Sequence, residues 1–227
     1  MTSGRPADGN VRPAGVAYGD AMETREEAVE PGTWRQYGPS TLPKPLEAAL
    51  EAFAERGYDG TSIREVAARA GLSVPGLYHH YPSKQALLVS LTTLVMRDLL
   101  DRSKQALAEA GPTPSERFDA VVESLLRFHM FRRNQAFVAS TEMRSMEPGN
   151  RKAYIALRDE QQRMLDEIVR DGVAKGEFGT GFPEDASRAV TTMCVAVASW
   201  YRPDGPLSPD EVVRRYLAIA RCAVGAR

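Results

Sequence analysis

Cysteine is scarce in this chain: Cys194 and Cys222 are the two cysteines among 227 residues, and no Cys-x-x-Cys pair occurs. This scarcity argues against a disulfide framework and against a zinc finger, which both need several cysteines at short spacings. Cys194 lies within the apolar run Met193–Tyr201, so we interpret it as a small buried side chain with an unreactive thiol. A redox-sensing thiol is the alternative at this position.

Long hydrophobic runs are also missing. The longest nearly apolar run, Met193–Tyr201, falls well short of the roughly 18 residues that cross a bilayer. The first residues are polar and rich in Gly and Pro, which is unlike the basic and then apolar pattern of a signal peptide. We therefore expect no membrane partner and a cytoplasmic location.

Neither sign of charge is in excess: 29 Lys and Arg stand against 30 Asp and Glu, for a formal net charge of −1. Charge alone therefore gives no indication of a nucleic-acid partner. DNA affinity, however, depends on Lys, Arg, hydroxyl groups and helix N-termini gathered on one face rather than on a positive total.

The chain has three histidines, His79, His80 and His129, and no visible set of nucleophile, base and orienting group. His79 and His80 are adjacent, and neighbours on a helix project about 100° apart, which disfavours a shared metal ion. His129 stands between Phe128 and Phe131, where lining a core or a pocket is the simpler interpretation. We expect no catalytic residues, no metal site and no cofactor.

What the sequence does contain is a pattern of two short helices between Thr61 and Lys84. The first helix is indicated by apolar residues at helical spacing, Ile63, Val66, Ala67 and Ala70. Thr61 or Ser62 can cap it, with Glu65 three residues after Ser62 completing a capping-box pattern. Gly71 stands where the helix is expected to end. A helix often ends with a residue in the left-handed conformation, which glycine adopts at little energetic cost because it has no Cβ.

The second helix is expected over Val74–Tyr81. Ser73 can cap it, Pro75 is tolerated in its first turn, and Pro82 ends it. Two short helices joined by a tight turn containing Gly form the helix-turn-helix unit, whose second helix enters the major groove of DNA.

The segment from Pro45 to about Leu88 contains an ordered pattern of residues: Phe53, Gly57, Thr61, Ile63, Val66-Ala67, Ala70-Gly71-Leu72-Ser73, Gly76, Tyr78, His80-Tyr81 and Lys84. In this pattern the segment resembles the N-terminal domain of TetR-family transcriptional regulators. Val74-Pro75 departs from the family pattern, because many relatives carry a basic residue there. The resemblance implies a regulator that binds double-stranded operator DNA.

The expected DNA-binding residues flank or form the second helix: Thr61, Ser62, Arg64, Ser73, Val74, Pro75, Gly76, Tyr78, His79 and Lys84. Hydroxyl, imidazole and ammonium groups suit phosphate contacts, while Ser73, Val74 and Pro75 can reach base edges or a thymine methyl group. Alternatives stay open at several positions. Thr61 and Ser62 can serve as caps, Arg64 can simply face solvent, and Gly76 can allow a tight crossing against the first helix of the domain.

The expected fold is all-α, because helical periodicity recurs and strand patterns are absent. We divide the chain into a flexible N-terminal extension over 1–43, a helix-turn-helix domain over 44–90 and a helical effector-binding and dimerisation domain over 91–227. Helices are expected over Pro45–Arg56, from a Ser83 cap onward, and over Ser115–Arg132, Asn134–Met146, Asn150–Lys175, Glu184–Tyr201 and Ser208–Val224.

The N-terminal extension contains two aromatic residues, Trp34 and Tyr37, that are unexpected in a free tail. They can dock on the body of the protein. Alternatively, the extension can form an arm that reaches DNA through Arg5, Arg12 and Arg35.

The expected effector-binding residues combine aromatic and Met side chains with Arg: Phe128, Phe131, Arg132, Met143, Tyr154, Arg158, Met193 and Trp200. Such a set suits an amphipathic anion with an acidic head, although an ordinary core is the alternative for each apolar member. The ending SWYRPDGPLSPDEVVRRYLAIA resembles TetR-type regulators of fatty-acid and sterol breakdown. That resemblance implies a small hydrophobic or acyl-CoA effector.

The last two helices are expected to form a homodimer interface as a four-helix bundle through two stripes, Val190, Cys194, Val197 and Tyr201 with Val213, Tyr216, Leu217 and Ala220. The sequence thus favours a homodimeric repressor that binds a palindromic operator and is released by its effector. A small helical enzyme and a ligand-insensitive DNA-binding protein are the alternatives.

Overall fold

The computed structural model describes residues 33–226, so the part of the N-terminal extension that includes Arg5 and Arg12 lies outside the described residues. The described chain is helical, with no strand. Its elements are η1 (Thr33–Arg35), α1 (Lys44–Gly60), α2 (Ile63–Arg69), α3 (Val74–His80), α4 (Lys84–Glu109), α5 (Pro114–Phe131), α6 (Arg133–Thr141), η2 (Glu142–Ser145), α7 (Pro148–Ala174), α8 (Pro183–Trp200) and α9 (Pro209–Val224). The expected all-α fold is confirmed.

Side-chain caps explain where several of these helices begin. Ser62, Ser73 and Ser83 each accept a hydrogen bond from the backbone N–H three residues on, at 3.2, 3.1 and 3.0 Å, and so cap α2, α3 and α4. Gly71 ends the turn after α2 with a φ of 69°, a conformation that side-chain-bearing residues rarely adopt. These local features follow the sequence expectations closely.

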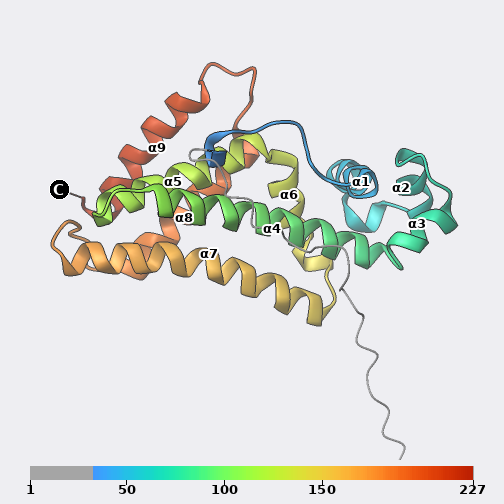
Figure 1. Ribbon diagram of the computed structural model, residues 1–227, viewed down its shortest axis with the longest axis horizontal. Coiled ribbons are helices and arrows are strands. Elements are labelled where there is room, and N and C mark those ends of the chain that lie inside the picture. Colours follow the sequence, from blue (N-terminus) through green and yellow to red (C-terminus); the bar gives the residue numbers. More distant parts are fainter. Residues whose placement is uncertain (1–32, 227) are drawn as a thin grey trace, which may run out of the picture. The chain divides into compact units, whose positions relative to one another are not determined.

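We use the term head for α1, α2 and α3, which pack around a small core. Leu46 and Phe53 of α1, Val66 of α2, Leu77 of α3 and Leu87 of α4 are all buried there. Figure 1 shows the head gathered beside the first turns of α4. Hydrophobic burial against α4 therefore joins the head to the rest of the chain.

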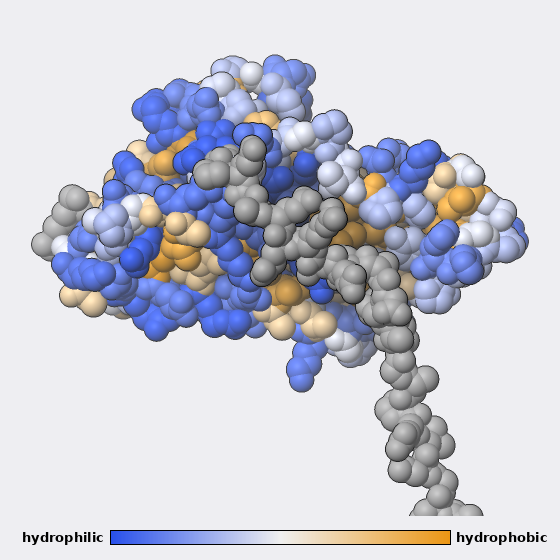
Figure 2. Space-filling view, in the orientation of Figure 1, coloured by the Kyte–Doolittle hydropathy of each residue, from blue (hydrophilic) through white to orange (hydrophobic). Residues whose placement is uncertain are grey.

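The remaining helices form the body. Helices α5 and α7 pack along α4, α8 packs against α5 and α7, and α9 packs on α5 and α8 (Figure 1). Hydrophilic residues cover most of the face seen in Figure 2, and hydrophobic residues reach the surface in patches. Among residues 33–226, no helix combines the length and the low charge needed to cross a membrane.

Residues 33–43 pack on the body instead of forming a free extension, and we call them the strap. Trp34 is 2% exposed, and its indole Nε1 donates to Glu109 Oε2 at 3.0 Å. Arg35 pairs with Glu123 through two bonds of 3.0 and 2.9 Å. Tyr37 stacks on Phe131 with ring centroids 4.7 Å apart. Here the structure differs from the expected flexible extension, and Arg35 is used to hold the strap rather than left free for DNA.

Candidate functional site

The helix-turn-helix forms as the sequence predicts, with α2 and α3 separated by four residues. Ser62, Arg64, Ser73, Pro75, Tyr78 and His79 are exposed on it, and Val74 and Gly76 are partly exposed. A Cβ on Gly76 would lie 3.1 Å from Ser73 Oγ, so the glycine leaves room for the serine cap rather than for a crossing helix. The surface around α3 is therefore open to a partner.

Thr61 is an exception among the expected DNA contacts. Its side chain is buried, and its hydroxyl lies 2.8 Å from the carbonyl oxygen of Gly57 and 3.0 Å from that of Ala52. Gly57 has a φ of 71°, so α1 bends there, and the Thr61 hydroxyl satisfies carbonyls that the bend frees. The prediction that Thr61 contacts DNA is wrong, because its hydroxyl faces inward.

Acidic side chains of the head pair with arginines, and the segment around α3 contains no acidic residue. Arg69 binds both carboxylate oxygens of Glu55, at 2.9 and 2.5 Å, and Glu65 at 3.0 Å. Arg56 lies 3.4 Å from Glu65. Acidic side chains of α1 and α2 are thus neutralised where the two helices meet. From residue 66 to residue 97 the sequence has no Asp or Glu, so α3 and the start of α4 present no carboxylate to an approaching polyanion.

Lys84 is held by the protein more firmly than the sequence indicates. Its ammonium donates to the carbonyl oxygens of Tyr58, at 2.7 Å, and Thr61, at 3.0 Å, and lies 4.1 Å from the centroid of the Tyr58 ring. An ammonium has three N–H donors, so one remains for a phosphate. Lys84 therefore ties α4 to the end of α1 as well as carrying charge toward the helix-turn-helix.

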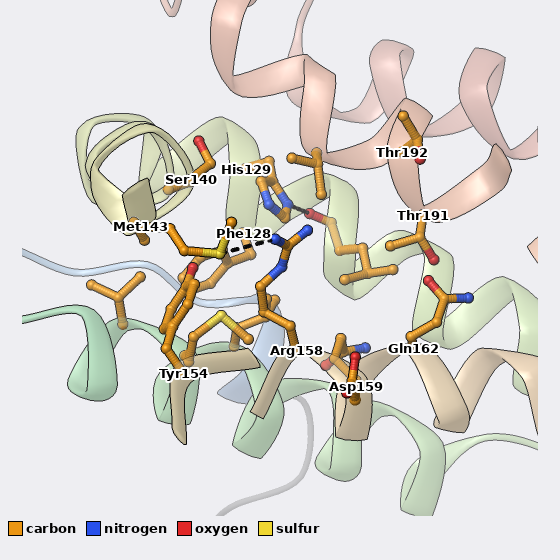
Figure 3. Close-up of a pocket in the computed structure, with 18 of the residues that line it drawn as sticks. Phe128, His129, Ser140, Met143, Tyr154, Arg158, Asp159, Gln162, Thr191 and Thr192 are labelled. Atoms are coloured by element: carbon orange, nitrogen blue, oxygen red, sulfur yellow. Dashed lines mark hydrogen bonds between the residues drawn. The ribbon is translucent and has the colours of Figure 1, made fainter. Parts of the chain in front are cut away.

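A cavity of about 540 Å³ opens in the body, between α4, α5, α6, α7 and α8 (Figure 3). Its walls are largely apolar, with Val95, Met96, Leu99, Leu125, Phe128, Ala136, Ala139, Met143, Tyr154, Ile155 and Val195 among the lining residues. The size falls within the range of pockets that enclose small organic ligands. Four of the expected effector-binding residues, Phe128, Met143, Tyr154 and Arg158, line it.

Charged groups also line the same cavity. Arg158, Asp159 and Arg188 are exposed residues among those that line it. Arg158 Nη1 donates to Met143 Sδ at 3.6 Å, a weak bond that leaves most of the guanidinium available (Figure 3). Burial raises the pKa of Tyr154 to about 12, so its phenol stays neutral. The arrangement suits a ligand with an acidic head and an apolar body.

The other four expected effector-binding residues lie elsewhere. Phe131 stacks on Tyr37, and Arg132 donates to the carbonyl oxygen of Gly38 at 3.0 Å, so both serve the strap. Met193 lies outside the cavity, and the exposed Trp200 stacks on Tyr216 at 5.6 Å. These four side chains therefore do not line this cavity.

The sequence interpretation also missed much of the lining. Gln161 and Gln162 of α7, and Arg188, Thr191, Thr192 and Val195 of α8, were not among the expected residues. The four α8 residues follow helical spacing, which was a usable signal. Their mixed polarity obscures this pattern, because Arg188, Thr191 and Thr192 are polar and do not form an apolar stripe with Val195.

The expected dimer stripes are wrong for six of their eight members. Val190, Cys194, Val197, Tyr201, Val213 and Ala220 are buried within the single chain, and Tyr216 and Leu217 remain partly exposed. Burial raises the pKa of the Cys194 thiol to about 12, in keeping with an unreactive side chain. A buried residue of one protomer cannot also cover a second copy.

A different apolar set faces outward on the same two helices, and we call it the outer stripe. It comprises Ala189, Met193, Ala196 and Trp200 of α8 with Tyr216, Ile219 and Ala223 of α9, all partly or fully exposed. The α8 members follow the spacing i, i+4, i+7, i+11, which places them on one face. The Trp200–Tyr216 stack joins the two helices.

Gln85, in the first turn of α4, connects three parts of the chain. Its Nε2 donates to Tyr58 Oη of α1 and to the carbonyl oxygen of Ser145 in η2, both at 3.1 Å. Its Oε1 accepts from the backbone N–H of Glu147 at 3.2 Å. Met143 of the cavity wall belongs to the same η2 turn. A side-chain amide thus links the head to a wall of the cavity.

The part of the chain that the structure describes contains no cluster of side chains suited to binding a metal ion. No group of three His, Cys, Asp or Glu side chains there is placed to hold an ion. His79 and His80 lie with ring centroids 5.3 Å apart at the exposed end of α3.

Comparison with known families matches both parts of the described chain. The family described as "Bacterial regulatory proteins, tetR family" matches residues 46–91, and the one described as "Tetracyclin repressor-like, C-terminal domain" matches residues 111–224. The HTH-type transcriptional repressor KstR2 of Mycobacterium tuberculosis is 31% identical over 180 residues, which cover 77% of this chain and 88% of that protein.

Solved structures share the fold. A bacterial regulatory protein in the tetR family from Rhodococcus RHA1 is 26% identical with a TM-score of 0.76, covering 81% of this chain and 96% of that one. The structure of AibR in complex with isovaleryl coenzyme A and operator DNA is 22% identical with a TM-score of 0.71, covering 81% and 97%. Together with the helix-turn-helix and the cavity, these matches establish that the chain belongs to the TetR family of bacterial transcriptional regulators.

Proposed function

We propose that this protein is a homodimeric repressor in the cytoplasm that leaves its operator when a small amphipathic effector fills the body cavity. The observation that carries the proposal is the position of α4. One helix of 26 residues holds the head through Lys84 and Gln85 and lines the cavity through Val95, Met96 and Leu99. A ligand that moves this helix changes the position of the head.

The proposed effector is an apolar acid or its coenzyme A thioester. A largely apolar cavity lined also by Arg158 and Arg188 suits such an anion, because guanidinium groups bind carboxylate and phosphate. The related KstR2 is named a repressor, and AibR, which shares the fold, was crystallised with isovaleryl coenzyme A. The ligand must bind the released state more tightly than the DNA-bound state, since only differential affinity shifts an equilibrium.

On the DNA, α3 is proposed to enter the major groove. Ser62, Arg64, Tyr78, His79 and the remaining N–H of Lys84 are proposed to position the phosphate backbone. Ser73, Val74, Pro75 and Gly76 lie at the first turn of α3 and are proposed to approach the base edges. The face without carboxylates supports this orientation.

Dimerisation is proposed through the outer stripe of α8 and α9. Two copies of this surface would bury the exposed Trp200 and Ile219 about a twofold axis, which gives an isologous four-helix interface. A twofold dimer presents two α3 helices, so we expect a palindromic operator with half-sites about one helical turn apart. No catalytic role is proposed.

The test is selection from random duplex DNA, repeated with a long-chain acyl-CoA present. We expect a palindrome to be enriched without the thioester and lost with it. A palindrome that is unaffected by thioesters and free acids would overturn the effector class and keep the DNA-binding function. No enrichment at low salt would contradict the repressor itself, because the electrostatic part of binding is strongest there.

A further inference from the structure

Two polar side chains lie deep in the otherwise apolar wall of the cavity. His129 of α5 and Gln161 of α7 both line it, and each is 4% exposed. Neither carries charge into the cavity in the way that Arg158 and Arg188 do. Buried polar groups in protein interiors usually have hydrogen-bond partners, so the partners of these two side chains indicate what the cavity can recognise.

The hydrogen bonding of His129 defines which of its ring nitrogens is free. Nδ1 lies 2.7 Å from the carbonyl oxygen of Leu125 (Figure 3). A carbonyl oxygen only accepts, so Nδ1 carries the hydrogen. Burial lowers the pKa of His129 to about 4, which keeps the ring neutral near pH 7. Nε2 therefore presents a lone pair and no hydrogen.

Gln161 is unsatisfied in the described chain. Both its amide nitrogen and its amide oxygen are buried without a hydrogen-bond partner among the described residues. The neighbouring Gln162, by contrast, donates to Asp166 at 2.7 Å. An unpaired buried amide destabilises a folded protein, and the Gln161 amide lies behind the cavity wall without access to its open space.

His129 restricts the chemistry of a ligand. The Nε2 lone pair can only accept a hydrogen bond, so it discriminates against ketones and ethers, which have no hydrogen to donate. Two arginines, Arg158 and Arg188, outnumber the lining carboxylate of Asp159, which favours an anionic over a cationic ligand. A hydroxyl group on such an anion has a hydrogen to donate to the imidazole.

We infer that the cavity selects an amphipathic anion whose apolar body carries a hydroxyl group, with His129 accepting the hydroxyl hydrogen. The inference rests on the proposed function, in which the cavity holds the effector. It adds that the effector is a hydroxylated acid or thioester, distinct from the plain acyl chain that an apolar wall alone would take.

The first test uses the unaltered dimeric protein and calorimetric titration. Hexadecanoic acid is compared with a series of monohydroxyhexadecanoic acids that carry the hydroxyl at successive carbons, each as free acid and as coenzyme A thioester. We expect at least one hydroxy isomer to bind about tenfold more tightly than its parent, the gain of one well-placed hydrogen bond. The acid and thioester arms identify which head group the arginines prefer.

Substitutions then assign the preference to His129. In His129→Phe the advantage of the hydroxy isomer should disappear, while the parent acid binds as well as before. Gln161→Met should keep the advantage and raise Tm by about 2–4 °C, because it removes an unpaired buried amide. The matched control is Ser124→Ala, which removes another buried unpartnered oxygen, away from the cavity, and should raise Tm without changing ligand preference.

The outcomes separate the inference from the proposed function. Parent and hydroxy ligands that bind equally would overturn the inference and leave an acyl-responsive repressor. An advantage that persists in His129→Phe would overturn the assignment to His129. If no acid or thioester binds and none releases DNA, the proposed function itself fails. Should His129→Phe not fold, the ligand series on the unaltered protein and on Gln161→Met still decides.

Discussion

Arg64 and Arg69 occupy the same short helix, α2, yet their surroundings differ. Arg69 is held by Glu55 and Glu65, and that cluster raises its pKa further above the usual range. Arg64 is exposed and makes no ion pair within the described chain. Arg69 thus has a structural role at the junction of α1 and α2, and Arg64 is the arginine available to a phosphate.

Arg64→Ala should weaken binding to all DNA sequences alike. Loss of one phosphate contact should reduce the slope of log affinity against log salt by about one unit per protomer. Fluorescence anisotropy with labelled operator, measured over a salt series, gives this slope. Arg64→Lys is the control and should keep it. An unchanged slope in the alanine variant would remove Arg64 from the interface.

His129 makes stability depend on pH. The neutral ring is favoured in the folded chain, where its pKa is about 4 against a usual 6.5, so the unfolded chain binds more protons between these values. Stability should therefore rise with pH across this window, and lowering pH from 7 to 4 should cost up to about 3 kcal/mol.

Urea unfolding at a series of pH values measures this effect. His129→Phe, which has no proton to gain, should show a shallower dependence between pH 4 and 6.5. Comparison of the two proteins isolates His129 from Asp159, Arg158 and Arg188, which line the same cavity and remain in both. Parallel curves would assign the pH dependence to other groups.

At the scale of elements, the strap is held by aromatic and cationic contacts. Tyr37 stacks on Phe131, and the Arg102 guanidinium lies 4.1 Å from the centroid of its ring. Arg102 also donates to the carbonyl oxygens of Trp34 and Gln36, at 3.1 and 3.0 Å. The strap leads directly into α1, so it fastens the beginning of the head to α4 and α5.

Tyr37→Ala should lower the free energy of unfolding by about 2 kcal/mol, through loss of the stack and of the cation–π contact. Tyr37→Phe keeps the ring and should change it by less than about 0.5 kcal/mol. Urea unfolding measures both. Equal losses in the two variants would mean that the hydroxyl, rather than the ring, holds the strap.

Helix α4 is the other connecting element, and Gln85 is where its first turn meets both α1 and η2. In Gln85→Ala the effector should bind with unchanged affinity, yet saturating effector should release operator DNA less completely than in the parent. Titration of labelled operator with and without effector measures this coupling. Arg97→Ala, on the exposed side of α4, is the control. Full release in Gln85→Ala would contradict the proposed route.

For the whole molecule, assembly determines whether two heads can meet one operator. Ile219 is 53% exposed and lies on the outer stripe. Ile219→Asp should bury a charge in the dimer interface, yield monomers in sedimentation velocity and lose operator affinity, since one head contacts half the phosphates. Ala108→Asp, on an exposed position of α4, should remain dimeric. A dimeric Ile219→Asp would place the interface elsewhere.

Local features of the fold could be predicted from the sequence because single residues determine them. Ser62, Ser73 and Ser83 cap helices, and Gly71 ends a turn, through contacts with their own chain neighbours. The boundaries of α3 followed from Ser73 and Pro82 for the same reason.

The direction in which each helix faces could not be predicted in this way. Helix α8 is apolar on two sides, with Val190 and Cys194 inside and Met193 and Trp200 outside, so periodicity could not decide which side is buried. The cavity is formed by helices distant in sequence, and the inward turn of Thr61 depends on the bend at Gly57. Such features depend on tertiary packing.

The two tryptophans of the chain stand at two different junctions, Trp34 inside the strap and Trp200 on the outer stripe. Their indole emission therefore supplies two built-in optical reporters, and neither indole lines the cavity, so a bound ligand does not quench them by direct contact. Trp34→Phe leaves a protein whose emission follows assembly on dilution, and Trp200→Phe leaves one whose emission follows detachment of the strap. The rates of strap detachment and of subunit separation can then be measured independently in a stopped-flow instrument.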